Sequence, residues 1–221
     1  MKAIVYYTKI IEGSDISSDL IAELIPPERD DRIKSCMNKM KKNILIAEEL
    51  LLRYILLERN LIKKHQIICR EYNEYGKSFL KNIPLELSIS HSLNIVGCAV
   101  AEDREIGLDI QAVKNIPIDI LRRFISDNEY KMILESDDKK NASNLIWNQK
   151  EAFLKCLGVG WAKKVSNYKN NFKGIVLNGV QYVIKQSKIE ENFNLAICMN
   201  EDDFEYQINY VEFQKLVGVV I

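Results

Sequence analysis

The chain has 221 residues and carries 31 basic and 31 acidic side chains, so its formal net charge is zero. This balance argues against a general nucleic-acid-binding protein, which needs an excess of positive charge, but it allows a local basic pocket for one phosphorylated ligand. Hydrophobic residues make up 47% of the chain, which is typical of a globular protein with one large domain or two small ones. The longest apolar run, residues 95–101, is far shorter than the roughly 20 residues that cross a bilayer.

Five cysteines are scattered along the chain without a C-x-x-C pair. They are Cys36, Cys69, Cys98, Cys156 and Cys198. An odd, widely spaced set in apolar surroundings predicts reduced core cysteines in a cytoplasmic protein. The chain has two histidines, His65 and His91, and such a small number argues against a zinc site.

The first part of the chain begins with a strand pattern and then becomes helical. Residues 2–7 are rich in β-branched and aromatic side chains and predict an opening strand. The pair Pro26-Pro27 predicts a turn into a helix. Residues 43–59 carry apolar side chains at helical spacing, and Asn60 stands where that helix would end.

Three short strand patterns follow, and the second half then passes from helices to strands. The first strands are expected at 86–90, 95–101 and 105–110, the helices at about 117–125, 127–135 and 142–157, and the later strands at about 174–178, 180–185, 194–200 and 205–211. We expect two halves, residues 1–105 and 106–221, each with helices packed on a small antiparallel sheet. That arrangement belongs to the α+β fold class.

One candidate site lies in the helix expected at 142–157, within the sequence WNQKEAFLK. Trp147, Glu151 and Lys155 stand four residues apart and therefore share one face of the helix. Apolar residues occupy the other faces, which predicts a largely buried helix, and Gly158 stands where a glycine would end it. An ordinary Glu–Lys pair on a solvated face would explain the same spacing.

A second candidate site lies in the strand that reads IGLDIQ, residues 106–111. The alternation of side chains along a strand sends Asp109 and Gln111 to the same side. A carboxylate and an amide oxygen two residues apart can both bind one hard cation such as magnesium. An amphipathic edge strand without a ligand would also explain the alternation.

Three further segments carry groups that suit a phosphate. Residues 87–92 (LSISHS) end a predicted strand with hydroxyls, a histidine and backbone N–H groups, and no G-x-S-x-G elbow marks a nucleophilic serine there. Residues 75–77 (YGK) place an ammonium beside a flexible glycine in a loop. Basic residues outnumber acidic ones between residues 28 and 42, which indicates either an anion site or a solvated face.

The order and spacing of these motifs resemble those of the 4′-phosphopantetheinyl transferases of the surfactin type. YGK at 75–77 precedes SISHS at 88–92, then GLDI at 107–110, then W-x-x-K-E-A-x-x-K at 147–155. The resemblance implies a pseudo-twofold pair of α+β halves, with coenzyme A and magnesium bound in the cleft between them. It also implies transfer of the phosphopantetheine arm to a serine of an acyl or peptidyl carrier protein, with release of 3′,5′-ADP.

The resemblance implies a metal site and an active-site lysine. Asp109 and Glu151 match the family's acidic magnesium ligands, and Gln111 stands where the family commonly has a third, a glutamate. Lys155 matches the family's active-site lysine. We expect Asp109, Glu151, Lys155 and His91 to take part in catalysis. Glu151 is the candidate for the base that takes the proton of the carrier serine, directly or through a metal-bound water.

The resemblance also implies a binding site for coenzyme A. The expected contacts are Arg29, Arg32, Tyr75, Gly76, Lys77, Ser90, His91 and Lys155. Arg29 and Arg32 fall near the basic positions that the family uses for the 3′-phosphate. Lys41, Lys42 and Asn43 stand where the family often has an arginine, so one phosphate contact departs from the family pattern.

The expected partner is an acidic helical carrier protein, with no nucleic acid and no membrane. We expect it to dock near Ile116–Ile125, a segment with more apolar side chains than one helix face needs and with Arg122 and Arg123 beside them. The alternative is that these apolar residues only cover the sheet. Because one chain supplies both halves, we expect a monomer. A coenzyme-A- or carrier-binding module that has lost catalysis is the alternative function, with Gln111 as its sign.

Overall fold

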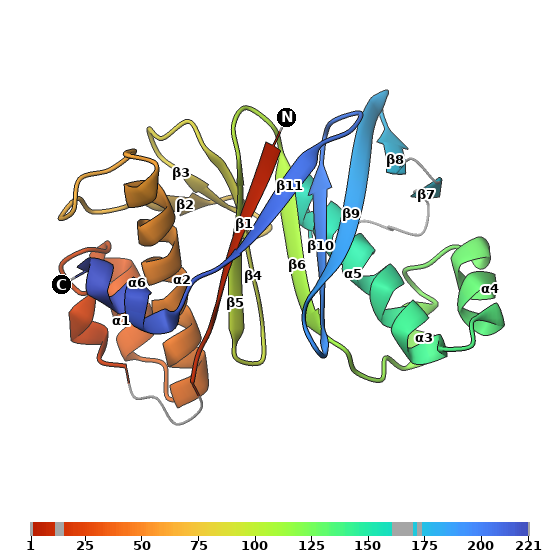
Figure 1. Cartoon of the computed structure of the whole chain (residues 1–221), viewed down its shortest axis with the longest axis horizontal. Helices are drawn as coiled ribbons and strands as arrows, with labels where there is room; N and C mark the ends of the chain where they lie inside the picture. Colours follow the sequence, from red (N-terminus) through yellow and green to blue (C-terminus); the bar gives the residue numbers. More distant parts are fainter. Residues whose placement is uncertain (1, 12–15, 161–169, 172–173, 221) are drawn as a thin grey trace.

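Two β-sheets lie side by side at the centre of the structure, and helices cover their outer flanks (Figure 1). The computed structural model describes residues 2–11, 16–160, 170–171 and 174–220. The strands are β1 (Lys2–Lys9), β2 (Arg70–Tyr72), β3 (Ser78–Leu80), β4 (Glu86–Ser92), β5 (Ile95–Ala101), β6 (Ile106–Ala112), β7 (Asn170–Asn171), β8 (Gly174–Leu177), β9 (Val180–Glu190), β10 (Phe193–Met199) and β11 (Glu205–Tyr210). The helices are α1 (Pro27–Lys34), α2 (Lys39–Glu58), α3 (Ile118–Leu121), α4 (Asp127–Glu135), α5 (Lys139–Leu157) and α6 (Phe213–Val220), with a short 3-10 helix at Ser18–Leu20. The fold is α+β, which confirms the fold class expected from the sequence.

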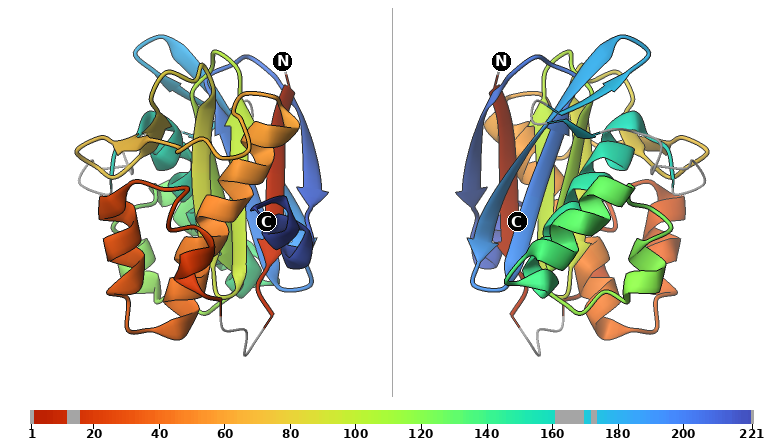
Figure 2. Two further views of the ribbon diagram at one scale, coloured as in Figure 1. Left: turned by 90° about the vertical axis from the view of Figure 1, so that its left-hand side faces the viewer. Right: turned by 90° about the vertical axis from the view of Figure 1, so that its right-hand side faces the viewer.

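The first sheet has the strand order β11-β1-β5-β4. β1 pairs antiparallel with β5 but parallel with β11, so the expectation of an antiparallel sheet is wrong for this half. A parallel pair needs a long connection between its strands, and here almost the whole chain separates them. The left view of Figure 2 shows α2 lying across the sheet, where its apolar residues form one core with β5 and α6.

The second sheet has the order β6-β10-β9-β8-β7, and its neighbouring strands pair antiparallel. α5 packs against β6 and β10, and the right view of Figure 2 shows it crossing this sheet. α3 and α4 lie beside α5 in a separate apolar cluster that includes Leu121, Ile133 and Ile146. α3 covers less than the helix expected at 117–125. Among the described residues, no helix is both long and apolar enough to span a membrane.

The end of the chain returns to the first half. β11 forms an edge of the first sheet, and α6 packs against α2. The division expected at residue 105 therefore separates the two sheets as far as β10, whereas residues 205–220 lie with the first half. The two halves are thus joined both at the connection from β5 to β6 and at the connection from β10 to β11.

The five cysteines differ in exposure. Cys98, Cys156 and Cys198 are buried, Cys36 is half-buried and Cys69 is exposed, so the prediction of core cysteines is wrong for two of them. All five are free thiols. Burial raises the pKa of the Cys98 thiol to about 12, which keeps this cysteine protonated near neutral pH.

Serine side chains join β4 to β6, the strands where the two sheets meet. Three backbone N–H groups of β6 donate to three hydroxyls of β4: Leu108 to Ser88 at 2.9 Å, Ile110 to Ser90 at 3.0 Å and Ala112 to Ser92 at 3.0 Å. Alternation along a strand turns every second side chain to the same side, so the sequence SISHS presents all three serines to β6. A buried N–H without a partner costs about 1–3 kcal/mol, so this serine row (Ser88, Ser90 and Ser92) holds the two halves together.

Gly107 allows α5 to approach β6 closely. A Cβ atom at this position would overlap the Ala152 carbonyl oxygen and the Cys156 backbone nitrogen. Both clashing groups belong to the helix backbone, which cannot move aside as the end of a flexible side chain could. The packing of α5 against β6 therefore requires the glycine of the GLDI motif. The same close approach determines how near α5 lies to Asp109, the next polar residue of β6.

We expect Gly107→Ala to destabilise the protein by about 3 kcal/mol, because overpacking against a fixed backbone forces the helix away from the strand. Thermal or urea unfolding followed by circular dichroism measures the effect. Gly218→Ala is the matched control, since a Cβ at Gly218 meets no atom within 4 Å and alanine is the better helix former. Equal stability of the Gly107→Ala variant and the wild type would contradict the close approach.

Candidate active site

A cavity of about 620 Å³ lies between the two halves. Its walls come from α1, α2, the β2–β3 hairpin, β4 and the C-terminal end of α5. The candidate residues that line it are Arg29, Arg32, Tyr75, Gly76, Lys77, Ser90, His91, Glu151 and Lys155. Asp109 and Gln111 lie on β6, outside this lining. Segments far apart in the sequence therefore meet around one cavity.

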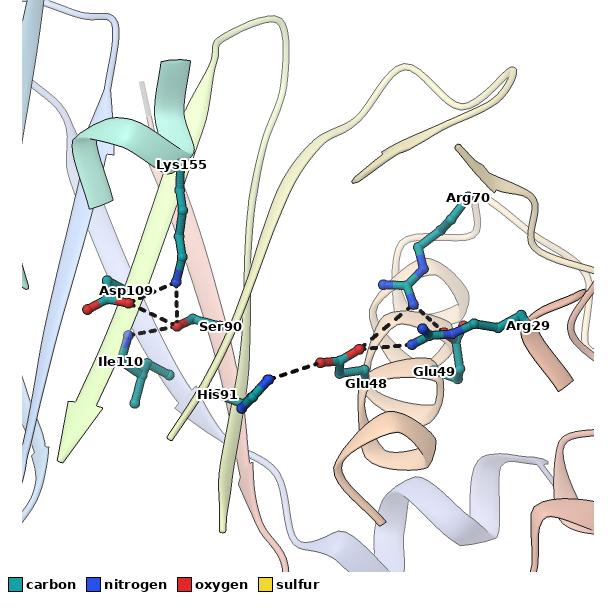
Figure 3. Close-up of polar contacts among 9 residues, drawn as sticks. All are labelled: Arg29, Glu48, Glu49, Arg70, Ser90, His91, Asp109, Ile110 and Lys155. Carbon is teal, nitrogen blue, oxygen red and sulfur yellow. Dashed lines mark hydrogen bonds and ion pairs between the residues drawn. The ribbon is translucent and has the colours of Figure 1, made fainter. Parts of the chain in front are cut away.

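Asp109 is the centre of a hydrogen-bond network beside the cavity, part of which is drawn in Figure 3. The Lys155 ammonium donates to Asp109 Oδ1 and to Ser90 Oγ, each at 2.8 Å. Ser90 Oγ lies 3.3 Å from the same Asp109 oxygen. Asn148 Nδ2 donates to Asp109 Oδ2 at 2.9 Å and to the Asp109 carbonyl oxygen at 3.0 Å. Asp109 is buried, and its charge is compensated by a lysine that reaches the cavity.

Glu151 lies one helical turn before Lys155, and both line the cavity, as their spacing on one helix face suggested. Trp147, one turn earlier, packs edge-on against Phe124 with ring centroids 5.8 Å apart. This residue therefore supports the segment around α3 and does not line the cavity. Gln111 is half-buried, and its side-chain nitrogen lies 3.4 Å from the carbonyl oxygen of Ala112, the next residue.

The chemistry of the donor set fits a magnesium ion. Asp109 and Glu151 lie on a strand and a helix that pack together, and carboxylate oxygens are the ligands that magnesium prefers. A carboxylate has about four lone-pair sites, and Asp109 uses three of them for Lys155, Ser90 and Asn148. Among the described residues, no group of three or more His, Cys, Asp and Glu side chains could hold a metal by itself. Two carboxylates still fit, because magnesium usually keeps several waters.

The YGK loop is fixed to the end of α5. Asn73 Oδ1 accepts hydrogen bonds from the backbone N–H groups of Tyr75 and Lys77, and Asn73 Nδ2 donates to the Gly158 carbonyl oxygen at 2.7 Å. The Lys77 ammonium donates to the carbonyl oxygen of Cys156 at 2.8 Å. Carbonyl groups at a helix C-terminus attract cations, so the loop and α5 form one wall of the cavity. Gly158 has φ of 65° and ends the helix, as the sequence predicted.

The opposite end of the cavity contains a network of charged side chains, shown on the right of Figure 3. Arg29 donates to Glu49 at 2.6 Å and to Glu48 at 2.9 Å, and Arg70 also pairs with Glu49. Burial by itself would lower the pKa of Arg29, but Glu49, Tyr72 and Glu48, in that order, outweigh burial and raise it. The arginine named from the sequence therefore lies at the cavity, and it is already paired with two carboxylates.

Sequence reasoning missed Asn148, Asn73 and Lys150. Lys150 belongs to the WxxKE motif, yet it is 1% exposed, and its ammonium lies 2.8 Å from Glu129 of α4. Glu129 also accepts from the Ser126 backbone in a capping box at the start of α4. The spacing S-x-x-E was the available signal for that cap. Lys150 therefore fastens α4 to α5, while its neighbour Glu151 lines the cavity.

We expect Asn148→Asp to destabilise the protein by about 2–4 kcal/mol at pH 8, because it removes two buried donors to Asp109 and adds a like charge. Two carboxylates in contact bind a proton more tightly in the folded state than in the unfolded state. The loss of stability in the variant therefore becomes smaller as pH falls. Urea unfolding at pH 8 and pH 5 measures both effects. Asn141→Asp, the same change in the first turn of α5, should be neutral or slightly stabilising. A pH-independent deficit would contradict the placement of Asn148.

The chain is similar in sequence to known proteins of one family. Residues 105–204 match the model of the 4′-phosphopantetheinyl transferase superfamily. The chain is 24% identical over 214 residues to the 4′-phosphopantetheinyl transferase Sfp of Bacillus subtilis, covering 92% of this chain and 95% of the relative. It is 32% identical over 145 residues to the 4′-phosphopantetheinyl transferase gsp of Aneurinibacillus migulanus, covering 64% and 58%.

Among solved structures, the crystal structure of Thermotoga maritima holo-[acyl-carrier-protein] synthase aligns with 44% of this chain and 62% of its own. The identity is 20% and the TM-score 0.37, a partial likeness on which no conclusion here rests. The family match spans β6 and α5, the two elements that hold Asp109, Asn148, Glu151 and Lys155 in place. Over residues 105–204 the chain thus matches the 4′-phosphopantetheinyl transferase superfamily, and over 92% of its length it is similar to curated 4′-phosphopantetheinyl transferases.

Proposed function

We propose that the chain transfers the 4′-phosphopantetheine arm of coenzyme A to a serine hydroxyl of an apo acyl or peptidyl carrier protein. One observation carries the proposal. A single cavity holds cations at both ends and has the Asp109–Lys155 pair and Glu151 beside one of them. The curated relatives are named 4′-phosphopantetheinyl transferases, which supports the same reaction class.

The cavity suits a ligand with two separate anionic groups, and coenzyme A carries a pyrophosphate and a phosphate monoester. Lys155 and Lys77 lie at the α5 end of the lining, and Arg29 and Arg32 come from α1 at the other end. Charge-assisted hydrogen bonds to phosphate are shorter and stronger than neutral ones. We assign the pyrophosphate to the α5 end, where His91 also faces the cavity, and the phosphate monoester to the α1 end.

The proposed step is a substitution at the β-phosphorus of the pyrophosphate. The carrier serine oxygen forms a bond to this phosphorus, and the bond from phosphorus to the bridging oxygen breaks. 3′,5′-ADP leaves with that oxygen and its electron pair. Lys155 and His91 would donate hydrogen bonds to the phosphate oxygens, where fixed positive charge stabilises the transition state. The serine proton passes to Glu151, directly or through one water.

Asp109 and Glu151 are the residues that would hold magnesium, which when bound neutralises the pyrophosphate charge and lowers the pKa of a bound hydroxyl or water. Gln111 offers an amide oxygen on the Asp109 face of β6. Ser90 and Asn148 orient Asp109 from two sides. We also place the reaction in the cytoplasm, a reducing compartment that suits five free thiols. A monomer would be sufficient, because both halves line one cavity.

The test of the proposed function is mass spectrometry of several apo carrier proteins incubated with the chain, coenzyme A and magnesium. The expected result is that one carrier gains the mass of phosphopantetheine and that 3′,5′-ADP appears in equal amount. Gln111 motivates the alternative, a binding module that has lost catalysis. Binding of coenzyme A without modification of any carrier would favour that alternative. Absence of coenzyme A binding would contradict both.

We expect Glu151→Gln to lower kcat for carrier modification by at least about 100-fold at saturating magnesium, because general base catalysis contributes this much or more. The fold should persist, since glutamine has the same shape and Glu151 is half-buried at the cavity. Glu135→Gln is the matched control, a glutamate on α4 whose side chain is 65% exposed. Retention of more than half of the wild-type kcat would show that Glu151 has no such role.

We further propose that the carrier docks on the segment around α3. Here the apolar residues of the segment fall into a buried and an exposed group. Leu121 and Ile125 are buried in the cluster that α3 and α4 share, whereas Ile118 and Ile120 are 38% and 45% exposed. Arg122 stacks on Tyr130 and pairs with Asp127, so it also supports α4. The exposed pair of isoleucines, with Arg123 beside it, is the part of the segment available to a partner.

We expect Ile118→Ser combined with Ile120→Ser to raise the carrier KM at least about fivefold, because truncating central apolar contacts costs about 1 kcal/mol or more. The Kd for coenzyme A should not change. Val176→Ser combined with Val180→Ser removes two similarly exposed side chains from the β8–β9 hairpin and is the matched control. An unchanged carrier KM in the α3 variant, or an equal rise in the control, would overturn docking at this segment.

A further inference from the structure

Glu48 places a negative charge in the wall of a cavity that is otherwise rich in cations. It comes from the buried helix α2 and lines the cavity together with Arg29, Arg70 and His91. Its side chain is 11% exposed, so it is held in place by its neighbours and does not extend into solvent. The reaction proposed above gives Glu48 no role, and at the end assigned to a phosphate a carboxylate opposes ligand binding.

The contacts of Glu48 place its carboxylate among cationic side chains. Its Oε2 lies 2.9 Å from Arg29 Nη2 and 3.9 Å from Arg70 Nη2, while its Oε1 lies 3.9 Å from His91 Nε2. Three cationic or potentially cationic groups therefore converge on one carboxylate (Figure 3). This is the arrangement that protein groups adopt around a bound anion. Glu48 thus acts as an internal counter-ion at this end, with a hydrogen bond from Arg29 and with Arg70 and His91 within ion-pair distance.

Resting on the proposed function, we propose that Glu48 is a specificity-determining residue that limits how strongly this cavity selects coenzyme A with its ribose phosphate monoester over dephospho-coenzyme A. The phosphate must share Arg29 and Arg70 with a carboxylate and also experiences its repulsion. Both effects act most strongly on the phosphate monoester, the group assigned to the Arg29 end of the cavity. The discrimination between the two ligands is therefore set by the charge at position 48.

The neighbouring residue provides a matched comparison. Glu49 pairs with the same two arginines, Arg29 at 2.6 Å and Arg70, but it lines a smaller neighbouring cavity of about 300 Å³. Glu49 therefore holds the two arginines from the side of the smaller cavity, whereas Glu48 lines the larger cavity together with them. Removing either charge changes the net charge of the protein equally. Only the change at position 48 removes a charge that itself lines the larger cavity.

The experiment measures Kd for coenzyme A and for dephospho-coenzyme A by calorimetry at constant magnesium, without carrier, in the wild type, Glu48→Gln and Glu49→Gln. The quantity of interest is the ratio of the Kd for dephospho-coenzyme A to the Kd for coenzyme A. Glu48→Gln should raise this ratio about tenfold, which corresponds to about 1.4 kcal/mol, mainly through tighter binding of coenzyme A. Glu49→Gln should change it less than about threefold. Glu48→Asp, which keeps the charge, should leave the ratio near the wild-type value.

Each outcome bears on the proposal separately from the proposed function. A ratio unchanged in Glu48→Gln, or raised equally in Glu49→Gln, would overturn the role of Glu48 even if the wild type binds coenzyme A and modifies a carrier. Failure of the wild type to bind either ligand would instead contradict the proposed function. If Glu48→Gln does not fold, the ratio in Glu48→Ala decides, since this variant also removes the charge and should raise the ratio.

Discussion

The contact between strands β4 and β6 is the constraint on which the rest of the structure depends. Each strand lies at the edge of its sheet, where backbone N–H groups have no partner within the sheet. The serine row supplies those partners through side chains, so the sheets meet without merging into one ladder. Ser90 belongs to the serine row and also accepts a hydrogen bond from the Lys155 ammonium. The element that joins the halves therefore also builds the wall of the cavity.

Charge at the cavity is balanced before any ligand arrives. At the α5 end Lys155 pairs with buried Asp109, and at the α1 end Arg29 pairs with Glu48 and Glu49. A buried charge without a partner would cost several kcal/mol, so these pairs stabilise the charged groups of the site. They also mean that an anionic ligand or a cation must exchange partners with the protein. The affinity for a ligand then depends on the free-energy difference between ion pairs within the protein and ion pairs with the ligand. A change in a single carboxylate such as Glu48 can therefore alter that affinity.

Local sequence patterns predicted much of the site, because local geometry determines which side chains share a face. Glu151 and Lys155 line one cavity because they are one helical turn apart, and SISHS turns its serines to one side because it is a strand. Contacts between distant segments left no such signal. Nothing near Asn148 in the sequence indicates that its side chain donates a hydrogen bond to Asp109, 39 positions away. The sequence around Lys150, with a charged neighbour, is typical of an exposed side chain. Lys150 is nevertheless buried, because Glu129 of α4 forms an ion pair with it. The parallel pairing of β11 was missed because its partner strand lies at the other end of the chain.

In the proposed function, the cavity between the halves holds coenzyme A with its pyrophosphate at the α5 end. A crystal structure of the chain with coenzyme A and magnesium tests this placement most directly. We expect pyrophosphate oxygens within hydrogen-bond distance of Lys155 and His91, and a cation bound by Asp109 and Glu151. We also expect the ribose phosphate beside Arg29. Coenzyme A bound outside this cavity, or a cation that neither carboxylate touches, would contradict this placement.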